Sequence, residues 1–438
     1  MPHKVSDQWP ERNLKMPAAQ LAAGTGSSVV ITACQVCDFQ DIETVMFVGY
    51  LPPVNTMRLI GQALEEQPAY PAAWLYCPKC QLVQLGLAVD KQVLFPPEYP
   101  YTSGATRILR ENFAELYRES SGIIPLAPGD LVIDIGSNDG TLLSNFQKAG
   151  HRVFGIEPSD VGKIAQQRGI ETVISFFDRA AAEKVRASHG AAKIITATNV
   201  FAHIEDIHGI IESVLLLLAP DGVFITESHY LMSLIETLQY DTIYHEHLRY
   251  YSLHSLSYLL AMHGLEVVHA IRIPTHGGSI RVYAARQGAQ VPRPSVAEVM
   301  QQESAVGIDA AALAEFKRRV VQSKLDLQAL LAGIKRKGER IYGIGAPSRA
   351  STLIHYAGLD DGILDCVLEV GDSLKVGKYM PGTIIPVLEE SKLYQDQPEY
   401  ALLLSWHIAE ELIPKISAKG FQGSFIVPLP EPRIINSR

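Results

Sequence analysis

The chain has 438 residues, of which 47% are hydrophobic and 19% are charged, and it carries a formal net charge of −9. Two or three domains with cores of their own fit this length, and the acidic balance argues against a dedicated nucleic-acid-binding surface. The densest apolar run, 214–219, is far too short to cross a membrane, and the chain starts without an apolar signal core. We therefore expect a cytoplasmic protein with neither a membrane nor a nucleic acid as its partner.

The N-terminal part contains four of the five cysteines of the chain. Residues 1–28 show no periodicity, and we expect them to form a mobile tail. The next part, 29–105, holds two Cys-x-x-Cys pairs, which can supply four thiolates to a tetrahedral Zn²⁺. The predicted ligands are Cys34, Cys37, Cys77 and Cys80. Four sulfur ligands leave no open coordination position, so the predicted zinc is structural. The alternative is that one pair is redox-active or incidental.

The stretch 131–143, LVIDIGSNDGTLL, combines an apolar strand, a glycine turn and a helix start. These are the parts of a cofactor-binding βα unit. The spacing D-x-G-x-x-x-G differs from the dinucleotide pattern G-x-G-x-x-G. It resembles the first motif of S-adenosylmethionine (SAM) methyltransferases, whose loop wraps the amino-acid end of the cofactor. Glu157 ends the next expected strand, about 20 residues after the first glycine, where a carboxylate holds a ribose diol. The alternative is an ordinary βαβ unit with an accidental glycine loop.

Helix and strand patterns alternate around this motif, starting with an amphipathic helix over 106–122. The alternation predicts a parallel sheet with helices on both faces. The expected strands are 153–157, 172–175, 193–198 and 223–227, and the expected helices are 142–149, 159–168, 179–186 and 206–218. Ligands of such sheets lie outside the carboxyl ends of the strands. Asn199 and His203 directly follow a strand and therefore belong at that rim. A hairpin over 271–283 closes the domain, to which we assign 106–290.

The densest polar and aromatic cluster in the chain is 240–252, YDTIYHEHLRYYS. His245 and His247 are two residues apart, so they do not share a helical face as in the H-E-x-x-H zinc pattern. Histidine is the side chain best suited to proton transfer near neutral pH, and Glu246 beside it can raise its basicity or fix its tautomer. We expect catalysis here because histidine, acid and tyrosines crowd one segment that follows a strand. The alternative is a polar loop with core tyrosines.

A second α/β domain is expected over 291–438. Its long helix, 311–337, could break at Gly333, and IYGIGAPSR after it reads as a strand, a glycine turn and a helix start. Further strands are expected at 365–370, 400–404 and 424–427. A glycine turn at a helix N-terminus suits an anion such as phosphate, and a tight structural turn is the alternative. The predicted fold is thus α/β, with a central Rossmann-like methyltransferase domain between a small zinc-binding module and a second Rossmann-like domain.

Several motifs then identify a family by their order: the four-cysteine module, DIGSNDG, YHEH with YYS, HGGSIR, and the late GIGAP. PPVN at 52–55 and CPKCQLVQL from Cys77 agree with them. Over about residues 30–430, the chain resembles the three-domain deoxysugar C-methyltransferases of antibiotic pathways, which methylate C3 of nucleotide-linked 4-keto-deoxysugars. The resemblance implies SAM-dependent methylation in which a histidine removes the proton alpha to a ketone, and the enolate attacks the sulfonium methyl group.

The resemblance also assigns roles to residues at matching positions. His247 is the implied base, with Glu246, Tyr244 and His203 as further catalytic residues. The implied cofactor-binding residues are Asp134, Gly136, Ser137, Asn138, Gly140, Glu157 and Asn199. The implied substrate-binding residues are Tyr101, Gly345, Pro347 and Arg349, with the late domain holding a nucleotide diphosphate.

The late domain departs from the family pattern. The family usually continues GAP with Lys-Gly-Asn, whereas 348–351 reads SRAS here, and its D-x-N-x-x-K stretch appears as EVGDSLK at 369–375. Arg349 can still meet a phosphate, but another enolisable ketone or a hydroxyl acceptor stays open. A zinc-bearing binding module with a vestigial SAM fold and a zinc-ribbon nucleic-acid protein are two further hypotheses, the latter disfavoured by the acidic balance. The sequence leaves the sugar, the nucleotide, the stereochemistry and the oligomeric state open.

Overall fold

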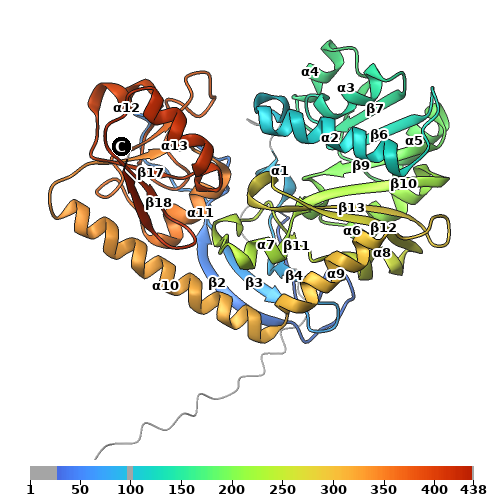
Figure 1. The fold of residues 1–438 in the computed structure, drawn as a ribbon, viewed down its shortest axis with the longest axis horizontal. Helices are drawn as coiled ribbons and strands as arrows, with labels where there is room; N and C mark the ends of the chain where they lie inside the picture. Colours follow the sequence, from blue (N-terminus) through green and yellow to red (C-terminus); the bar gives the residue numbers. More distant parts are fainter. Residues whose placement is uncertain (1–26, 96–101, 437–438) are drawn as a thin grey trace, which may run out of the picture.

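The computed structural model describes residues 27–95 and 102–436. Two α/β domains lie at opposite ends of the molecule, and the N-terminal strands run between them (Figure 1). None of the helices in the described part combines the length and apolarity needed to cross a bilayer. The predicted tail, 1–28, falls outside the described residues except for Ser27 and Ser28, which hydrogen bond with Asp90.

The N-terminal module is built on a four-stranded antiparallel sheet in the order β11-β4-β3-β2. Its strands are β2 (Glu43–Leu51), β3 (Tyr70–Tyr76), β4 (Val83–Leu85) and β11 (Arg249–Tyr250). A smaller pair joins β1 (Val29–Val30) to β5 (Leu87–Ala88), and the short helix α1 (Lys91–Leu94) follows. Strand β11 comes from the predicted catalytic segment, so the zinc module and that segment share one sheet.

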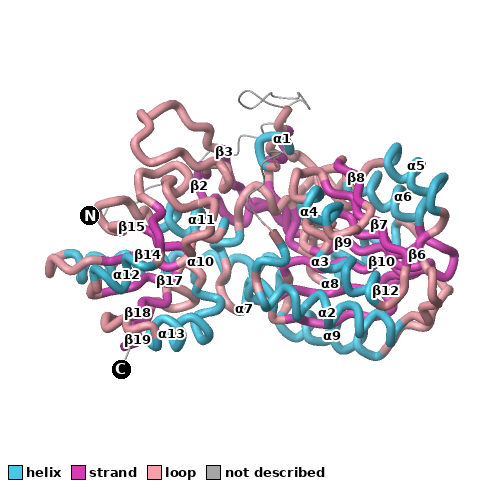
Figure 2. Tube along the Cα trace, turned by 90° about the horizontal axis from the view of Figure 1, so that it is seen from above, coloured by secondary structure: helices cyan, strands magenta, loops and turns pink. Residues whose placement is uncertain are grey.

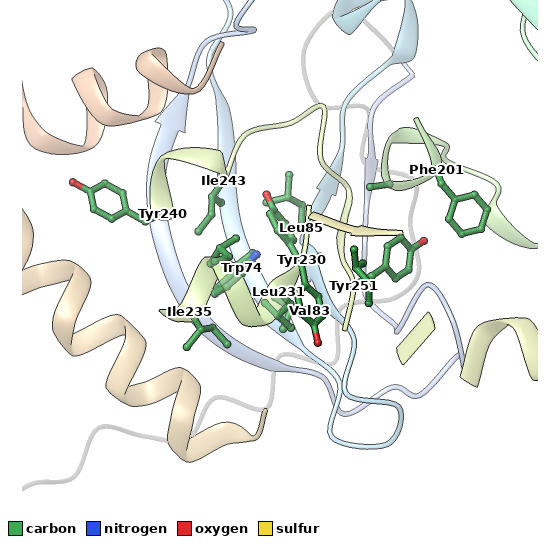
Figure 3. Close-up of a cluster of buried hydrophobic side chains, with 14 of the residues drawn as sticks. Trp74, Val83, Leu85, Phe201, Tyr230, Leu231, Ile235, Tyr240, Ile243 and Tyr251 are labelled. Carbon is green, nitrogen blue, oxygen red and sulfur yellow. The ribbon is translucent and has the colours of Figure 1, made fainter. Parts of the chain in front are cut away.

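A buried apolar cluster fixes this sheet on the central domain (Figure 3). Trp74 of β3 is fully buried, and its ring packs edge-on against Tyr250 with centroids 5.2 Å apart. Val83 and Leu85 of β4 lie in the same cluster as Tyr230 and Tyr251 of the central domain. Burial of several large side chains stabilises the contact by about 1.5–3 kcal/mol for each fully buried one, so the module and the domain behave as one packed unit.

The central domain carries a seven-stranded sheet in the order β12-β13-β10-β9-β6-β7-β8. Its strands are β6 (Leu131–Ile135), β7 (Arg152–Glu157), β8 (Thr172–Ile174), β9 (Ala192–Thr198), β10 (Leu218–His229), β12 (Leu265–Ile273) and β13 (Ser279–Arg286). The strands from β8 to β10 are parallel, and β13 pairs antiparallel with both β10 and β12. The parallel sheet and the closing hairpin predicted from the sequence are confirmed.

Helices cover this sheet, and several begin where the sequence places a side-chain cap. They are α2 (Arg107–Ile123), α3 (Thr141–Lys148), α4 (Gly162–Gln167), α5 (Arg179–His189), α6 (Ile207–Leu217), α7 (Leu231–Glu236) and α8 (Leu253–Met262). Asp178 and Asp206 accept hydrogen bonds from the amides of Ala181 and Gly209, which caps α5 and α6. The sequence analysis missed α7 and α8, which flank the polar and aromatic cluster.

The C-terminal part begins with two helices, α9 (Pro294–Val306) and α10 (Ala310–Lys335). Helix α9 packs on β12 and α8 of the central domain, whereas α10 runs unbroken through Gly333 towards the second domain (Figures 1 and 2). That domain has a six-stranded sheet in the order β16-β15-β14-β17-β18-β19. Its elements are β14 (Ile341–Ile344), α11 (Ser348–Ala357), β15 (Cys366–Glu369), β16 (Val387–Glu389), α12 (Ser391–Asp396), β17 (Tyr400–Leu403), α13 (Ala409–Ala418), β18 (Ser424–Val427) and β19 (Arg433–Asn436). The predicted second α/β unit is confirmed.

Candidate active site

A cavity of about 740 Å³ lies where the three parts of the molecule meet. The N-terminal module contributes Asn55 to its lining, the carboxyl ends of the central strands contribute Gly136 and Glu157, and the C-terminal domain contributes Pro347 and Lys375. The position outside the carboxyl ends of the parallel strands is the one expected for a ligand of this fold.

The glycine loop after β6 fits closely against the rim of the cavity. Gly136 has a φ of 71°, and a Cβ atom there would lie 2.4 Å from Cγ1 of Val200. Asn138 and Gly140 also have positive φ values, 50° and 76°. A side chain at position 136 is therefore excluded by both conformation and space, and the backbone of the loop comes close to whatever fills the cavity.

Glu157 ends β7 and lies in the cavity wall, 5% exposed. Its Oε2 accepts a hydrogen bond from the amide of Asn138 at 2.9 Å, and its Oε1 accepts one from the amide of Ser159 at 2.9 Å. The carboxylate thus links the glycine loop to the loop after β7. Oε1 also accepts a hydrogen bond from Oγ of Ser159 at 2.5 Å, so the acceptor site that remains is on Oε2, and it suits a hydroxyl of a ribose.

We expect Glu157→Gln to weaken SAM binding by about 1–3 kcal/mol, because the amide keeps the size of the side chain but loses charge and one acceptor. Titration calorimetry with SAM measures the effect. Glu171→Gln, which changes a glutamate outside the cavity lining, is the control. Equal SAM affinity in the wild-type protein and Glu157→Gln would place the ribose elsewhere.

Asn199 follows β9 and lies in the same wall. Its backbone is left-handed, with a φ of 57°, and its amide donates to the carbonyl of Glu227 at 2.7 Å. Its side-chain Oδ1 is buried and has no hydrogen-bond partner within the described part of the chain. A buried acceptor left unpaired is costly, so this oxygen fits a donor group supplied by a bound cofactor.

Three other predicted cofactor residues, Asp134, Ser137 and Gly140, do not line the cavity. Asp134 is buried, and its Oδ1 accepts a hydrogen bond from Oγ1 of Thr196 at 2.6 Å. Burial, with a smaller contribution from the charge of Glu157, raises the pKa of Asp134 to about 7. Asp134 therefore ties β6 to β9 behind the loop, and contact of these three residues with the cofactor stays a prediction.

His247 lines the cavity and is 4% exposed. Its Nδ1 lies 2.8 Å from the carbonyl oxygen of Thr242. A carbonyl can only accept, so Nδ1 carries the proton and Nε2 keeps a free lone pair. Burial lowers the pKa of His247 to about 4, although the bond to Thr242 opposes this and the charges of His276 and Arg349 add to it. The imidazole is therefore neutral and can accept a proton.

Among the described residues, five histidines line the cavity: His203, His229, His247, His276 and His407. The first four are linked by ring contacts, and we call these four residues the histidine cluster. The ring centroids of His229 and His203 lie 4.6 and 5.1 Å from that of His247, and His276 lies 5.6 Å from His229. Sequence reasoning placed His203 at this rim but missed His229 and His276. The signal for His229 was its position at the end of a strand, and the signal for His276 was the HGGSIR motif.

The histidine cluster makes the fold sensitive to acid. Burial lowers the pKa of His247 and His276 to about 4 and holds that of His203 and His229 well below 6.5. Unfolding returns each pKa to about 6.5, so the unfolded chain binds more protons below that pH. The free energy of unfolding should therefore fall as the pH drops from about 6.5 to 4, by up to about 1.4 kcal/mol per pH unit for each histidine.

The raised pKa of Asp134 gives a slope of the opposite sign, because this carboxyl is protonated in the folded chain below about pH 7. Burial also raises the pKa of Glu227, which adds to this opposite slope. These two carboxyls stand against the four histidines of the cluster and against His245 and His407, whose pKa values burial lowers to about 4 and about 2, so the net effect stays destabilising. Urea unfolding at several pH values between 7.5 and 4.5 measures the slope, and a flat profile would show that the cluster is hydrated and titrates normally.

Tyr244 and Glu246 lie beside His247 in the cavity, as the sequence predicted for neighbours in YHEH. The rings of Tyr244 and His247 are 4.2 Å apart, and Oε1 of Glu246 accepts a hydrogen bond from Nδ2 of Asn55 at 2.5 Å. His245 points elsewhere, with its Nε2 3.3 Å from the carbonyl oxygen of Pro71. Only one histidine of the motif therefore reaches the cavity.

The C-terminal domain contributes its glycine turn. Gly345 has a φ of 81°, and the amide of Ala346 donates to Oε2 of Glu369 at 2.8 Å. Lys375 donates from Nζ to the carbonyl of Ala346 at 2.6 Å. Pro347, Arg349 and Lys375 line the cavity and Gly345 does not. Tyr101, predicted to bind substrate, lies outside the described residues.

The four cysteines of the N-terminal module converge, with all Sγ atoms within 4.8 Å of one another. Cys34 and Cys80 are 3.4 Å apart and Cys37 and Cys77 are 3.6 Å apart, each measured between Sγ atoms. Tetrahedral Zn–S bonds of about 2.3 Å place the sulfurs about 3.8 Å apart, so these residues fit a closed, structural zinc site.

Both cysteine pairs form the same turn. The residue after the second cysteine, Asp38 or Gln81, has a left-handed backbone with a φ of 55° or 58°. Its amide donates to the carbonyl of the first cysteine, Cys34 or Cys77. The repetition of this turn explains how two separate pairs present their sulfurs in matching geometry.

Comparisons with known proteins agree with this organisation. Family models match 34–95 as a zinc binding domain, 105–270 as a methyltransferase domain and 274–430 as a C-methyltransferase C-terminal domain. The C-methyltransferase NovU of Streptomyces niveus is 35% identical over 413 residues, which cover 93% of this chain and 97% of NovU. The chain belongs to the C-methyltransferase family. The resemblance found in the sequence is thereby confirmed, and this C-methyltransferase uses SAM as methyl donor and has a zinc-binding N-terminal module.

Solved structures match the C-methyltransferase only distantly. Magnesium protoporphyrin IX methyltransferase from Synechocystis PCC 6803 with bound SAM is 16% identical and has a TM-score of 0.30, covering 41% of this chain and 78% of that one. The Haloferax volcanii complex of the Trm112 activator with a methyltransferase gives 15% identity and a TM-score of 0.34, covering 42% and 94%. The assignment therefore depends on the family and on the site.

Proposed function

We propose that this C-methyltransferase removes a proton from the carbon alpha to a ketone and methylates that carbon. The acceptor in this proposal is C3 of a nucleotide-linked 4-keto-deoxysugar in natural-product biosynthesis. The observation that carries the proposal is the tautomer of His247. Its Nδ1–H is fixed on the carbonyl of Thr242, which leaves Nε2 as a neutral acceptor in the cavity that the glycine loop also lines.

Carbon is a poor nucleophile until it is deprotonated, so this reaction needs a base that some methylations of hydroxyls do not. Nε2 of His247 takes the alpha proton, and the electrons of the C–H bond move into the enolate, whose charge develops on the carbonyl oxygen. Tyr244 is suited to stabilise that oxygen, because burial holds the pKa of its hydroxyl well above the usual value and keeps it a donor. SAM supplies the electrophilic methyl group.

Glu246 and Asn55 place a polar pair on the side of the N-terminal module. The first turn of α11 and Lys375 place positive potential on the side of the C-terminal domain. A ketosugar that bridges the two sides would present its ring to His247 and its nucleotide diphosphate, which stays attached to the sugar, to α11. This arrangement supports a nucleotide sugar as the substrate class.

Turnover with dTDP-4-keto-2,6-dideoxyhexose that carries deuterium at C3 tests the proposal. Mass spectrometry should find a gain of one methyl group with loss of the label. A methylated product that keeps the label would exclude attack by C3 and favour a hydroxyl acceptor. Binding of SAM without any product would keep the cofactor assignment but reject this sugar in favour of another enolisable ketone.

A further inference from the structure

The support of His247 comes from a short 3-10 turn, Tyr240–Thr242, which we call the 240–242 turn. The carbonyl of Thr242 accepts the hydrogen bond from Nδ1 of His247 and a second one from the hydroxyl of Tyr250 at 3.3 Å. The orientation of this single carbonyl therefore sets both the tautomer of His247 and the direction of its Nε2. Whatever holds the turn also holds the base.

The C-terminal domain binds the 240–242 turn at Asp241, whose carboxylate is fully buried. Arg349 of α11 binds it with two bonds of 2.8 Å, from Nε to Oδ2 and from Nη2 to Oδ1. Nε1 of Trp406, which follows β17, donates to Oδ2 at 2.7 Å. The guanidinium also lies over the Trp406 ring, 5.0 Å from its centroid. The forked pair and the stacking fix the guanidinium in one orientation.

Two further contacts join the same helix to the same segment. Oγ1 of Thr352 donates to the carbonyl of Ile243 at 3.2 Å, and the ring of Tyr356 meets that of Tyr240 with centroids 5.1 Å apart. Arg349, Thr352 and Tyr356 lie at helical spacing on α11, so one face of the helix touches the segment at successive residues.

All three nitrogen atoms of the Arg349 guanidinium already donate hydrogen bonds to protein acceptors, and its charge is paired with that of Asp241. Its other nitrogen, Nη1, donates to the carbonyl of His276 at 3.2 Å, and Nη2 also donates to Oε1 of Gln239 at 3.2 Å. Moving the guanidinium to a phosphate would leave the buried carboxylate of Asp241 without its cation, which is strongly unfavourable. The positive charge is therefore committed to the turn.

We propose that Arg349 is a positioning residue: from the C-terminal domain it holds Asp241, and through the 240–242 turn it sets the orientation of His247. The inference builds on the proposed role of His247 as the base. It gives α11 a task in the chemical step in addition to any contact with substrate, and it replaces the expectation that Arg349 meets a phosphate. Loss of Arg349 should therefore lower kcat and leave the KM of the sugar nearly unchanged.

Four variants test this inference. Arg349→Met and Asp241→Asn each remove one side of the pair, Thr352→Val removes a weaker contact without a buried charge, and Arg319→Ala is the control. Arg319 joins α10 to the carbonyl of Ile235 at 3.3 Å without touching the turn. A displaced base costs up to about 10²-fold in rate, so we expect kcat to fall about 10–100-fold in the first two variants and less in Thr352→Val.

The double variant Arg349→Met with Asp241→Asn should be no slower than the slower single variant, because both changes act through one turn. SAM affinity and the KM of the sugar should stay within about twofold of the wild-type values, since neither ligand loses a contact. A rise in KM in Arg349→Met that is absent in Asp241→Asn would show that Arg349 binds the substrate. Losses in kcat no greater than that of Arg319→Ala would also overturn the inference.

A readout without substrate separates this inference from the proposed function. In histidine-¹⁵N-labelled protein, long-range ¹H–¹⁵N correlation spectra report the tautomer of each imidazole, and the signal that His247→Gln removes is that of His247. The Nδ1–H tautomer should dominate in the wild-type protein and in Arg319→Ala. It should be mixed with the Nε2–H tautomer in Arg349→Met and, to a smaller extent, in Thr352→Val. An unchanged His247 signal in Arg349→Met would reject the inference, even if the ketosugar proved not to be the substrate.

Discussion

Replacing His247 with glutamine should lower kcat by about 10²–10⁴-fold, the usual contribution of a positioned general base. Glutamine can still donate to the carbonyl of Thr242, but it has no lone pair basic enough to take a proton from carbon. SAM affinity should be nearly unchanged, because the glycine loop and Glu157 stay in place. Steady-state turnover and titration calorimetry with SAM measure the two effects, and exchange of the substrate alpha proton for deuterium should disappear with the turnover.

His245→Gln is the matched control, because His245 is two residues away in the same segment and points to Pro71 instead of the cavity. It should retain turnover. Equal losses in both variants would mean that the segment is disturbed as a whole. A large loss of SAM binding in His247→Gln would assign the residue to the cofactor and not to proton transfer.

Cys77→Ser should release the zinc and destabilise the N-terminal module, since binding energies of structural zinc sites reach about 10–16 kcal/mol in zinc-finger peptides. Loss of the zinc should also affect catalysis, because β4 of the N-terminal module pairs with β11 of the segment that contains His247. The amide of Leu85 in β4 donates to the carbonyl of Leu248 at 2.9 Å, directly after His247, and β4 begins three residues after Cys80. Turnover should therefore fall together with the metal content.

Metal analysis, thermal unfolding and turnover of the full-length protein measure these effects. Cys366→Ala is the control, because Cys366 is buried in β15 of the C-terminal domain and does not belong to the group of four sulfurs. It should keep one zinc per chain. A fully folded and active Cys77→Ser variant without metal would reject the zinc site as a structural element.

The elements that the sequence predicted correctly are those that local patterns encode. The strand and glycine turn around Gly136 follow from an apolar run that ends in residues able to adopt a left-handed backbone. The hairpin of β12 and β13 and the start of α11 were found in the same way. Helices α7 and α8 were missed, although α8 carries a local signal: Leu253, Leu256 and Leu260 lie at helical spacing and are buried.

Only part of the candidate site could be predicted from the sequence. Positions directly after strands led to Asn199 and His203, since topology alone brings the carboxyl ends of parallel strands together. The four cysteines were found from spacing, because a tetrahedral metal needs a fixed ligand count whatever the intervening chain does. By contrast, no local pattern indicated that Asp134 would turn away from the cavity towards Thr196, since a one-dimensional motif does not state the direction of a side chain.

By itself, then, the sequence determined the α/β class and the four cysteines that fit zinc, and it predicted the cofactor loop and the segment around His247, because each depends on contacts or spacings that are short along the chain. Only the tertiary structure decided that β11 joins the sheet of the zinc module, that five of the described histidines line one cavity, and that Arg349 is paired with Asp241, 108 residues away. These pairings are decided by which buried charges and unpaired strand edges find partners when separate segments pack together. That is a property of the whole fold and not of any local stretch.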